Sequence, residues 1–171
     1  MRVERSFSFV DLCGFTRYTD THGDDAAVDV LTRFRACVRE TASEHGVRVG
    51  KWLGDGAMFV SMSGPQLVEM ILSLSHHADG LDMRLPLRAG MSSGGVILFE
   101  GDDYIGGPVN LAARLCDAAE PHELLGSAEL AGSVPAWADC IDVGPQPVPG
   151  FVQRIEVVRI QAAKLPVHLA R

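Results

Sequence analysis

Residues 47–62 read VRVGKWLGDGAMFVSM, with two short apolar runs on either side of Gly54-Asp55-Gly56. A Gly/Asp turn between two β-rich runs is typical of a tight hairpin, because glycine and aspartate tolerate the left-handed backbone that such turns need. We therefore predict two antiparallel strands joined at Asp55, and the other elements are arranged around this hairpin.

Strand and helix patterns flank the hairpin on both sides. Before it, the β-rich residues 5–12 predict a strand, and an apolar stripe over residues 24–44 predicts a helix. After it, we predict a second helix over residues 65–79. One or two strands follow over residues 86–99, with a bend or bulge at Gly94-Gly95.

The last part of the chain begins with an acidic loop over residues 100–103. Gly106-Gly107-Pro108 then predicts the first turn of a third helix that runs to Pro121. Short strands are expected over residues 123–160, and the last of them is predicted over residues 154–160.

The order strand, helix, strand, strand, helix, strand is the βαββαβ pattern of ferredoxin-like folds. We therefore predict an α+β fold whose antiparallel sheet carries the helices on one face, with strands added at the C-terminal end. The chain has 171 residues, which is typical of a single domain. We expect this domain to span residues 1–171, with a core from about 6 to 160.

Composition excludes several classes of function. The net charge of −7 argues against nucleic-acid binding, which requires a basic surface. The four cysteines match neither a zinc motif nor a CxxC redox pair. The N-terminal residues do not resemble a signal peptide, and no window reaches the roughly 18 apolar residues of a membrane span. We expect a cytoplasmic protein with reduced thiols.

Asp11 ends the first predicted strand, and Asp55 lies in the hairpin turn. In a ferredoxin-like sheet the first strand lies beside the hairpin, so the two carboxylates are expected to converge. Two convergent carboxylates form a hard-oxygen site for Mg²⁺. Taken singly, each aspartate is more often a turn residue or a solvated strand end.

The turn after Asp11 favours the metal interpretation. Gly14, Phe15 and Thr16 lead into a helix start, where free backbone N–H groups can bind phosphate. A carboxylate metal site beside such a turn is the arrangement that nucleotide chemistry requires.

Asn110 and Arg114 are spaced i, i+4 and therefore share one face of the third helix. Asparagine can bind a sugar oxygen, and arginine can neutralise phosphate charge bidentately. The alternative is an exposed polar face on which Arg114 pairs with Asp117.

Lys51 and Asp103 form a donor and acceptor pair. A lysine ammonium only donates hydrogen bonds and a carboxylate only accepts them, so the pair fits the acceptor N1 and the donor N6 amine of adenine. Guanine presents the reverse pattern. The alternative is an ordinary surface lysine and an ordinary loop aspartate.

Together, these segments resemble the class III nucleotide cyclase catalytic domain, and the match is close to the small actinobacterial adenylyl cyclases. Three motifs carry the resemblance in the family's order, namely FVDLCGFT (9–16), KWLGDGAMF (51–59) and DYIGGPVNLAARL (103–115). The overlap runs from about residue 6 to 160.

The resemblance implies a role for each matching position. It implies two Mg²⁺ or Mn²⁺ ions at each active site, held by Asp11, the carbonyl of Leu12, and Asp55. ATP is expected to contact Lys51 and Asp103 with its purine, Asn110 with its ribose and Arg114 with its α-phosphate. The remaining expected substrate contacts are Gly14, Phe15, Thr16 and Ile105.

The resemblance also implies a head-to-tail homodimer with composite active sites and no membrane partner. One protomer supplies both metal aspartates, and the other supplies Lys51, Asp103, Asn110 and Arg114. The expected reaction converts ATP to 3′,5′-cyclic AMP and pyrophosphate. Two alternatives stay open: a guanylyl or mixed-specificity cyclase, and a catalytically silent nucleotide-binding dimerisation module.

One position departs from the family. Many members carry a lysine near the last strand that contacts the terminal phosphates, but residues 149–154 read PGFVQR and contain no lysine. Arg154 is a candidate substitute, and the departure concerns triphosphate affinity more than reaction type.

Overall fold

The computed structural model describes residues 1–80, 85–101 and 103–163. Asp102, in the expected acidic loop, therefore lies outside the described residues. In chain order the elements are β1 Arg2–Leu12, α1 Phe15–His22, α2 Asp24–Glu44, β2 Arg48–Leu53, β3 Gly56–Ser61, α3 Gly64–Gly80, β4 Leu87–Phe99, β5 Asp103–Ile105, α4 Gly107–Ala118, β6 Leu124–Ser127, the 3₁₀ helix η1 Ala128–Ser133, β7 Ala138–Gln146 and β8 Ile155–Ala162.

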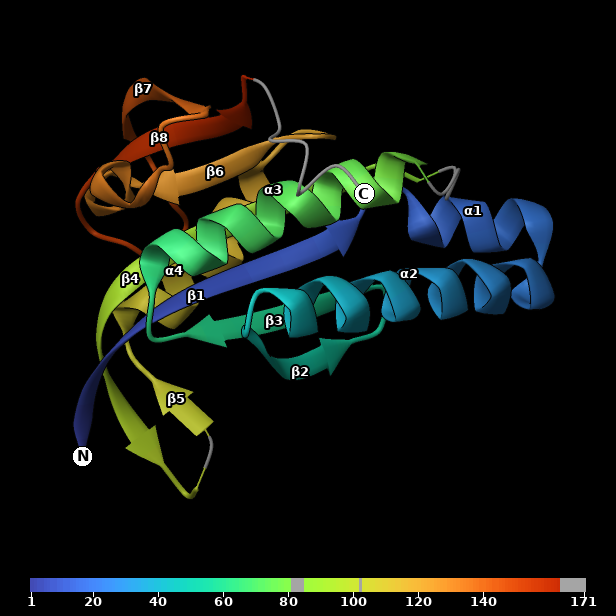
Figure 1. Ribbon diagram of the computed structural model, residues 1–171, viewed down its shortest axis with the longest axis horizontal. Helices are drawn as coiled ribbons and strands as arrows, with labels where there is room; N and C mark the ends of the chain where they lie inside the picture. Colours follow the sequence, from blue (N-terminus) through green and yellow to red (C-terminus); the bar gives the residue numbers. More distant parts are fainter. Residues whose placement is uncertain (81–84, 102, 164–171) are drawn as a thin grey trace.

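The strands of the described residues form one eight-stranded sheet in the order β2-β3-β1-β4-β6-β8-β7, and β5 pairs with β4 (Figure 1). The part β2-β3-β1-β4, with α2 and α3, is the predicted ferredoxin-like core, which is confirmed. Strand β6 runs parallel to β4, whereas β8 and β7 continue antiparallel. The predicted strands at the C-terminal end therefore extend the sheet beyond β4.

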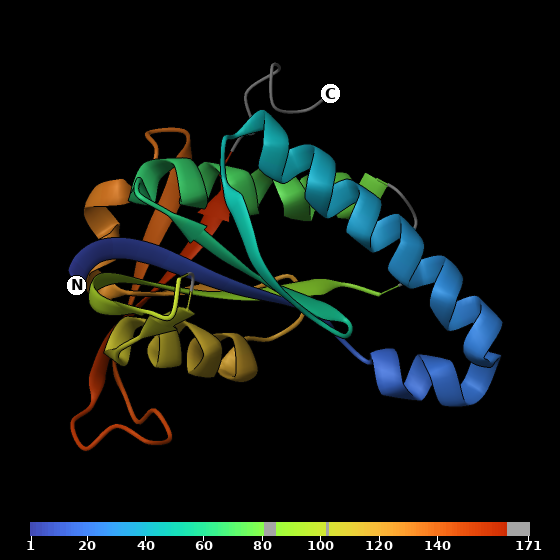
Figure 2. The ribbon, with the colours of Figure 1, turned by 90° about the horizontal axis from the view of Figure 1, so that it is seen from below.

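Helices cover both faces of the sheet, so the prediction of helices on one face is wrong for α4 (Figure 2). Val10 and Leu12 of β1 belong to the core beneath α2 and α3. Phe7, on the opposite face of β1, packs in a second cluster with Ala112 of α4. Because the central strand is apolar on both faces, the sheet needs a helix on each side to exclude water.

The contact between α4 and the sheet depends on Gly90 in β4. A Cβ at this position would lie 2.1 Å from the backbone nitrogen of Cys116 and 2.3 Å from the carbonyl oxygen of Ala112. Both distances are far below van der Waals contact, so only glycine allows the helix backbone to approach this closely. This approach determines how near α4 lies to the strand ends.

The outer half of β4 and the short strand β5 form an arm that extends away from the sheet (Figure 1). Strand β4 is continuous through the predicted bend, and a Cβ at Gly94 would lie 2.9 Å from Pro108. Asp103 begins β5 and pairs with Phe99, so its assignment to a loop was wrong. The strand is only three residues long, too short for a sequence pattern to reveal.

None of the helices in the described ranges combines the length and the apolar character that a membrane crossing requires.

We predict that Gly90→Ala lowers the free energy of unfolding by about 1–3 kcal/mol, because the added methyl overlaps the backbone of α4. Gly107→Ala is the matched control at the start of the same helix, where a Cβ meets no atom within 4 Å. The control should change stability by less than about 0.5 kcal/mol. Urea denaturation of both variants measures the difference, and equal losses would contradict the close-approach argument.

Candidate active site

Asp11 and Asp55 lie next to one another at the end of the β1–β3 ladder, as the fold prediction requires. Asp11 is opposite Gly56, and the backbone N–H of Leu12 donates to the carbonyl of Asp55 at 3.1 Å. Gly54 has φ +68°, the left-handed conformation that a tight hairpin turn needs. The register of β1 against the hairpin therefore brings the two carboxylates together.

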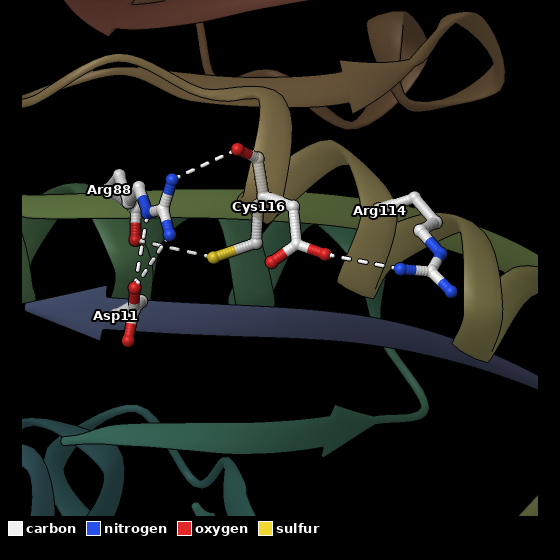
Figure 3. A network of polar contacts seen from close by, with 5 residues as sticks. Asp11, Arg88, Arg114 and Cys116 are labelled. Atoms are coloured by element: carbon white, nitrogen blue, oxygen red, sulfur yellow. Dashed lines mark hydrogen bonds and ion pairs between the residues drawn. The ribbon is translucent and has the colours of Figure 1, made fainter. Parts of the chain in front are cut away.

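The sequence interpretation missed Arg88, which pairs with Asp11 (Figure 3). Arg88 lies directly opposite Asp11 on β4, and its Nη2 and Nε donate to Asp11 Oδ2 at 2.9 and 3.1 Å. The side chains are only 27% and 28% exposed, so the pair is largely shielded from solvent. The one available signal was an arginine in the otherwise apolar segment LPLRAGM, since a charge in such a strand needs a partner.

The pKa values of both partners of this ion pair are raised, but for different reasons. Burial raises the pKa of Asp11, and repulsion from Asp55 adds to the effect, while the bond from Arg88 only partly opposes it. Burial alone would lower the pKa of Arg88, but the hydrogen bond and charge of Asp11 raise it overall. The charged carboxylate of Asp11 is therefore still disfavoured overall, and additional positive charge nearby would stabilise it.

Arg88 also contacts the last turn of α4 (Figure 3). Its Nη1 donates to the carbonyl oxygen of Asp117 at 2.9 Å, one of the groups that a helix end leaves without a partner. The thiol of Cys116 in turn donates to the Arg88 carbonyl at 3.7 Å, and burial raises the pKa of this thiol to about 12. Cys116 is therefore a protonated packing residue.

The turn that the sequence predicts to bind phosphate follows directly after β1, the strand that carries Asp11. Gly14 has φ +78° and precedes α1, which begins at Phe15. The first N–H groups of a helix have no partner within it, so those of Phe15 and Thr16 are available to an anion. None of the residues of α1 is buried, which leaves this end of the helix open to a ligand.

Lys51 of β2 and Asp103 of β5 form an ion pair, although they are 52 residues apart. Each side chain is about half exposed, at 50% and 51%. The pair joins the arm to the hairpin strand. Ile105 lies two residues beyond Asp103 and is 53% exposed.

Asn110 and Arg114 both lie on the exposed side of α4. Arg114 Nη1 lies 3.5 Å from Asp117 Oδ2, which is the alternative pairing expected from the sequence. In the described part of the chain, neither residue makes a hydrogen bond or ion pair to Asp11 or Asp55. One chain therefore keeps the carboxylate pair apart from the Asn/Arg pair.

Two further observations limit the site. Among the described residues, no group of three or more His, Cys, Asp and Glu side chains gathers in a way that could hold a metal ion. Arg154 lies between β7 and β8, where its Nη1 donates to the carbonyl of Pro145 at 3.2 Å. Asp11 and Asp55 therefore form a pair that no third His, Cys, Asp or Glu of the described residues joins.

Comparisons with known proteins give relatives of this chain. It is 38% identical over 149 residues to an uncharacterised protein of Mycobacterium tuberculosis, a match that covers 87% of this chain and 39% of the relative. It is 30% identical over 132 residues to an adenylate cyclase of Glutamicibacter nicotianae, covering 77% of this chain and 32% of that protein. The chain thus spans well under half the length of these relatives. No protein-family model matches it.

Solved structures also resemble the chain. The adenylyl cyclase CyaB from P. aeruginosa has a TM-score of 0.86 and 25% identity, with 96% of both chains covered. The guanylate cyclase domain of RhGC from Catenaria anguillulae, solved in complex with GTP, has a TM-score of 0.83 and 17% identity, with 96% of this chain and 100% of that chain covered. At this lower identity the second likeness shows the fold alone.

We predict that Arg88→Gln destabilises the metal-free protein by about 1–3 kcal/mol at neutral pH, because it leaves the half-buried Asp11 beside Asp55 without its counter-charge. Asp11 then has a pKa even further above its unfolded value. Stability therefore falls as pH rises through that folded pKa, and the loss shrinks at low pH, where Asp11 is protonated. Thermal denaturation across pH measures this.

Arg114→Gln is the matched control, since it removes an exposed arginine whose pair with Asp117 is worth well under 1 kcal/mol. Its effect on stability should be small at every pH. A loss in Arg88→Gln that does not depend on pH would contradict the assigned partnership with Asp11.

Proposed function

The chain belongs to the class III nucleotide cyclase catalytic domains, and from this premise we propose that it is an adenylyl cyclase that converts ATP to 3′,5′-cyclic AMP and pyrophosphate. The observation that carries the reaction class is the adjacency of Asp11 and Asp55 beside the Gly14 turn. The observation that favours ATP is the pairing of Lys51 with Asp103.

The carboxylate pair fits divalent metal ions. Mg²⁺ is commonly held by one or two carboxylates together with substrate phosphates, and Mn²⁺ prefers similar oxygen ligands. Asp11 and Asp55 repel each other, and Asp11 already binds a cationic group. The proposed ligands for two ions are these carboxylates with the main-chain carbonyl of Leu12. When bound, the ions neutralise phosphate charge and lower the pKa of the ribose 3′-hydroxyl.

Asp11 can serve as a metal ligand while it keeps its ion pair. Both bonds from Arg88 go to Asp11 Oδ2, and a carboxylate has a second oxygen, here Oδ1, that can accept independently. Arg88 also donates to the Asp117 carbonyl at the end of α4. The proposed role of Arg88 is therefore to hold the Asp11 carboxylate in place.

The nucleotide is recognised by residues that lie on α4, β2 and β5. Lys51 donates to N1 of adenine, and Asp103 accepts from the N6 amine, in exchange for their contact with each other. Asn110 orients the ribose. The 3′-hydroxyl loses its proton to water and its oxygen attacks the α-phosphorus, the bond to the bridging oxygen breaks, and pyrophosphate leaves with the electron pair. Arg114 stabilises the charge that develops on the α-phosphate.

Arg114 reaches the phosphate at little cost. Its pair with Asp117 is 3.5 Å long and both side chains are more than half exposed, at 54% and 64%. Exposed pairs of this kind contribute about 0–1 kcal/mol, so a substrate phosphate easily competes with Asp117.

A head-to-tail homodimer completes the proposed site. Asn110 and Arg114 are exposed, and within the described residues of one chain they make no hydrogen bond or ion pair to Asp11 or Asp55; in the proposed dimer a second copy brings the two halves together. The arm offers an apolar face for such contact: Ile97 and Ile105 are paired across β4 and β5, and both are exposed, as is Phe99. Exposed apolar side chains in a cluster are typical of protein interfaces.

We predict that the purified protein forms cyclic AMP from ATP with Mn²⁺, and that Asp55→Asn lowers turnover by about 100-fold or more because it removes a metal ligand. Asp139→Asn, an exposed aspartate on β7, is the matched control and should keep full activity. Product formation is measured with ATP and GTP in competition. Preferred use of GTP would contradict the purine assignment, and nucleotide binding without turnover would indicate a silent binding module.

The composite site makes a separate prediction about mixed dimers. Asp55→Ala and Arg114→Ala proteins should each be inactive, because each loses one half of both sites. A heterodimer of the two retains one intact site, so mixing should restore activity to as much as about one quarter of the wild type, given statistical assembly. Activity and subunit exchange are measured together. Exchange without recovery would contradict shared sites.

A further inference from the structure

Trp52 of β2 lies beneath two arginines of α2. The guanidinium carbons of Arg35 and Arg39 each lie 5.1 Å from the centroid of the Trp52 ring. The two arginines are spaced i, i+4 and so share one face of the helix. Both contacts lie within the range of cation–π attraction. Helix α2 is thus fixed to the hairpin strand immediately before the turn that carries Asp55.

Arg35 makes one further hydrogen bond for which Arg39 has no counterpart among the described residues. Its Nη2 donates to the carbonyl oxygen of Gly54 at 3.4 Å. Its Nε is buried and has no hydrogen-bond partner among the described residues. A donor that is removed from water without a partner is unfavourable, so the packing on Trp52 holds this guanidinium against the hairpin. Arg35 therefore joins α2 to the residue that directly precedes Asp55.

The Gly54-Asp55 turn is held from two sides. Leu12 of β1 donates its N–H to the Asp55 carbonyl at 3.1 Å, and Arg35 of α2 donates to the Gly54 carbonyl. With φ of +68° at Gly54, the turn depends on glycine and has no side chain of its own at this residue to pack against the helix. The direction of the Asp55 carboxylate therefore depends on contacts to neighbouring elements.

Trp52 also holds β2 on the face opposite to the one that carries Lys51. Lys51 pairs with Met58, which belongs to the cluster on the α4 face, whereas Trp52 pairs with Ala57, which belongs to the core beneath α2. Successive side chains of a strand point to opposite faces. Trp52 thus anchors, on the α2 face, the strand that presents Lys51 on the other.

We propose that Arg35 is a positioning residue for Asp55: it stacks on Trp52, donates to the Gly54 carbonyl and so orients the metal-binding turn. The proposal rests on the function proposed above. Arginine suits the task because its planar group can stack on an aromatic ring and donate in its own plane at the same time. Arg39 shares the stacking alone and serves as the internal comparison.

The experiment compares Arg35→Gln with Arg39→Gln. Each change removes one positive charge and one contact with Trp52, but only Arg35→Gln removes the bond to Gly54. Mn²⁺ binding is measured by electron paramagnetic resonance with a non-hydrolysable ATP analogue present. We expect Arg35→Gln to weaken Mn²⁺ binding by about tenfold, in the range known for groups that orient metal ligands. Arg39→Gln should change it by less than about twofold.

Arg35→Lys separates positioning from folding, since lysine can donate to the carbonyl but cannot stack as a planar group. It should restore part of the lost Mn²⁺ affinity and keep the protein folded even if Arg35→Gln is unstable. Thermal denaturation of all three variants provides the comparison of stability. Equal Mn²⁺ affinities in the Arg35 and Arg39 variants would overturn the proposal.

Hydrogen exchange of the amides of residues 53–57, in the absence of metal and nucleotide, tests the turn directly. Arg35→Gln should speed exchange at these amides more than Arg39→Gln does, whether or not the protein is a cyclase. Equal exchange in the two variants would overturn the proposal. A wild-type protein that binds Mn²⁺ and nucleotide but forms no cyclic AMP would instead overturn the proposed function alone.

Discussion

Strand β1 lies between β3 and β4 and is buried on both of its faces, so the alternation of its side chains connects two separate cores. Val10 and Leu12 pack beneath α2 and α3, while Phe7 packs toward α4. A shift of one residue in register would move each of these side chains to the other face of the sheet, where it would no longer fit its core. The same register places Asp11 beside the hairpin turn on one side and opposite Arg88 on the other. Packing of the apolar residues therefore determines the positions of the charged ones.

The charged groups at the strand ends are partly compensated by partners within one chain. Asp11 lies in a partly buried place beside a second carboxylate, where an unpaired charge is costly. Arg88 offsets part of that cost and at the same time donates to the carbonyl of Asp117 at the end of α4. At the proposed purine site Lys51 and Asp103 pair with each other, but they do so in solvent, where such a pair contributes little. Exchange of partners is thus easier at the exposed pair than at the buried one.

The packing of α4 on the sheet explains why Asn110 and Arg114 face outward. Helix α4 packs closely on β4 through Gly90 and turns Asn110 and Arg114 to the surface. The neighbouring arm exposes apolar side chains from both of its strands. A surface that combines exposed apolar groups with exposed polar groups is typical of an interface that a second molecule covers. The contacts of Arg35 and Arg39 with Trp52 lie on the opposite side of the sheet, where they leave that surface free.

The sequence by itself determined the hairpin around Asp55, the ferredoxin-like order of elements and the residue types of the candidate site, because glycine turns, periodicity and short motifs are local properties of the chain. Tertiary structure alone decided that α4 covers the second face, that Asp103 begins a strand, that Arg88 pairs with Asp11 and that Arg35 reaches the turn. Each of these depends on strand register or on helix packing between residues far apart in the chain. Such contacts are selected by the fit of the whole core, which local patterns do not specify.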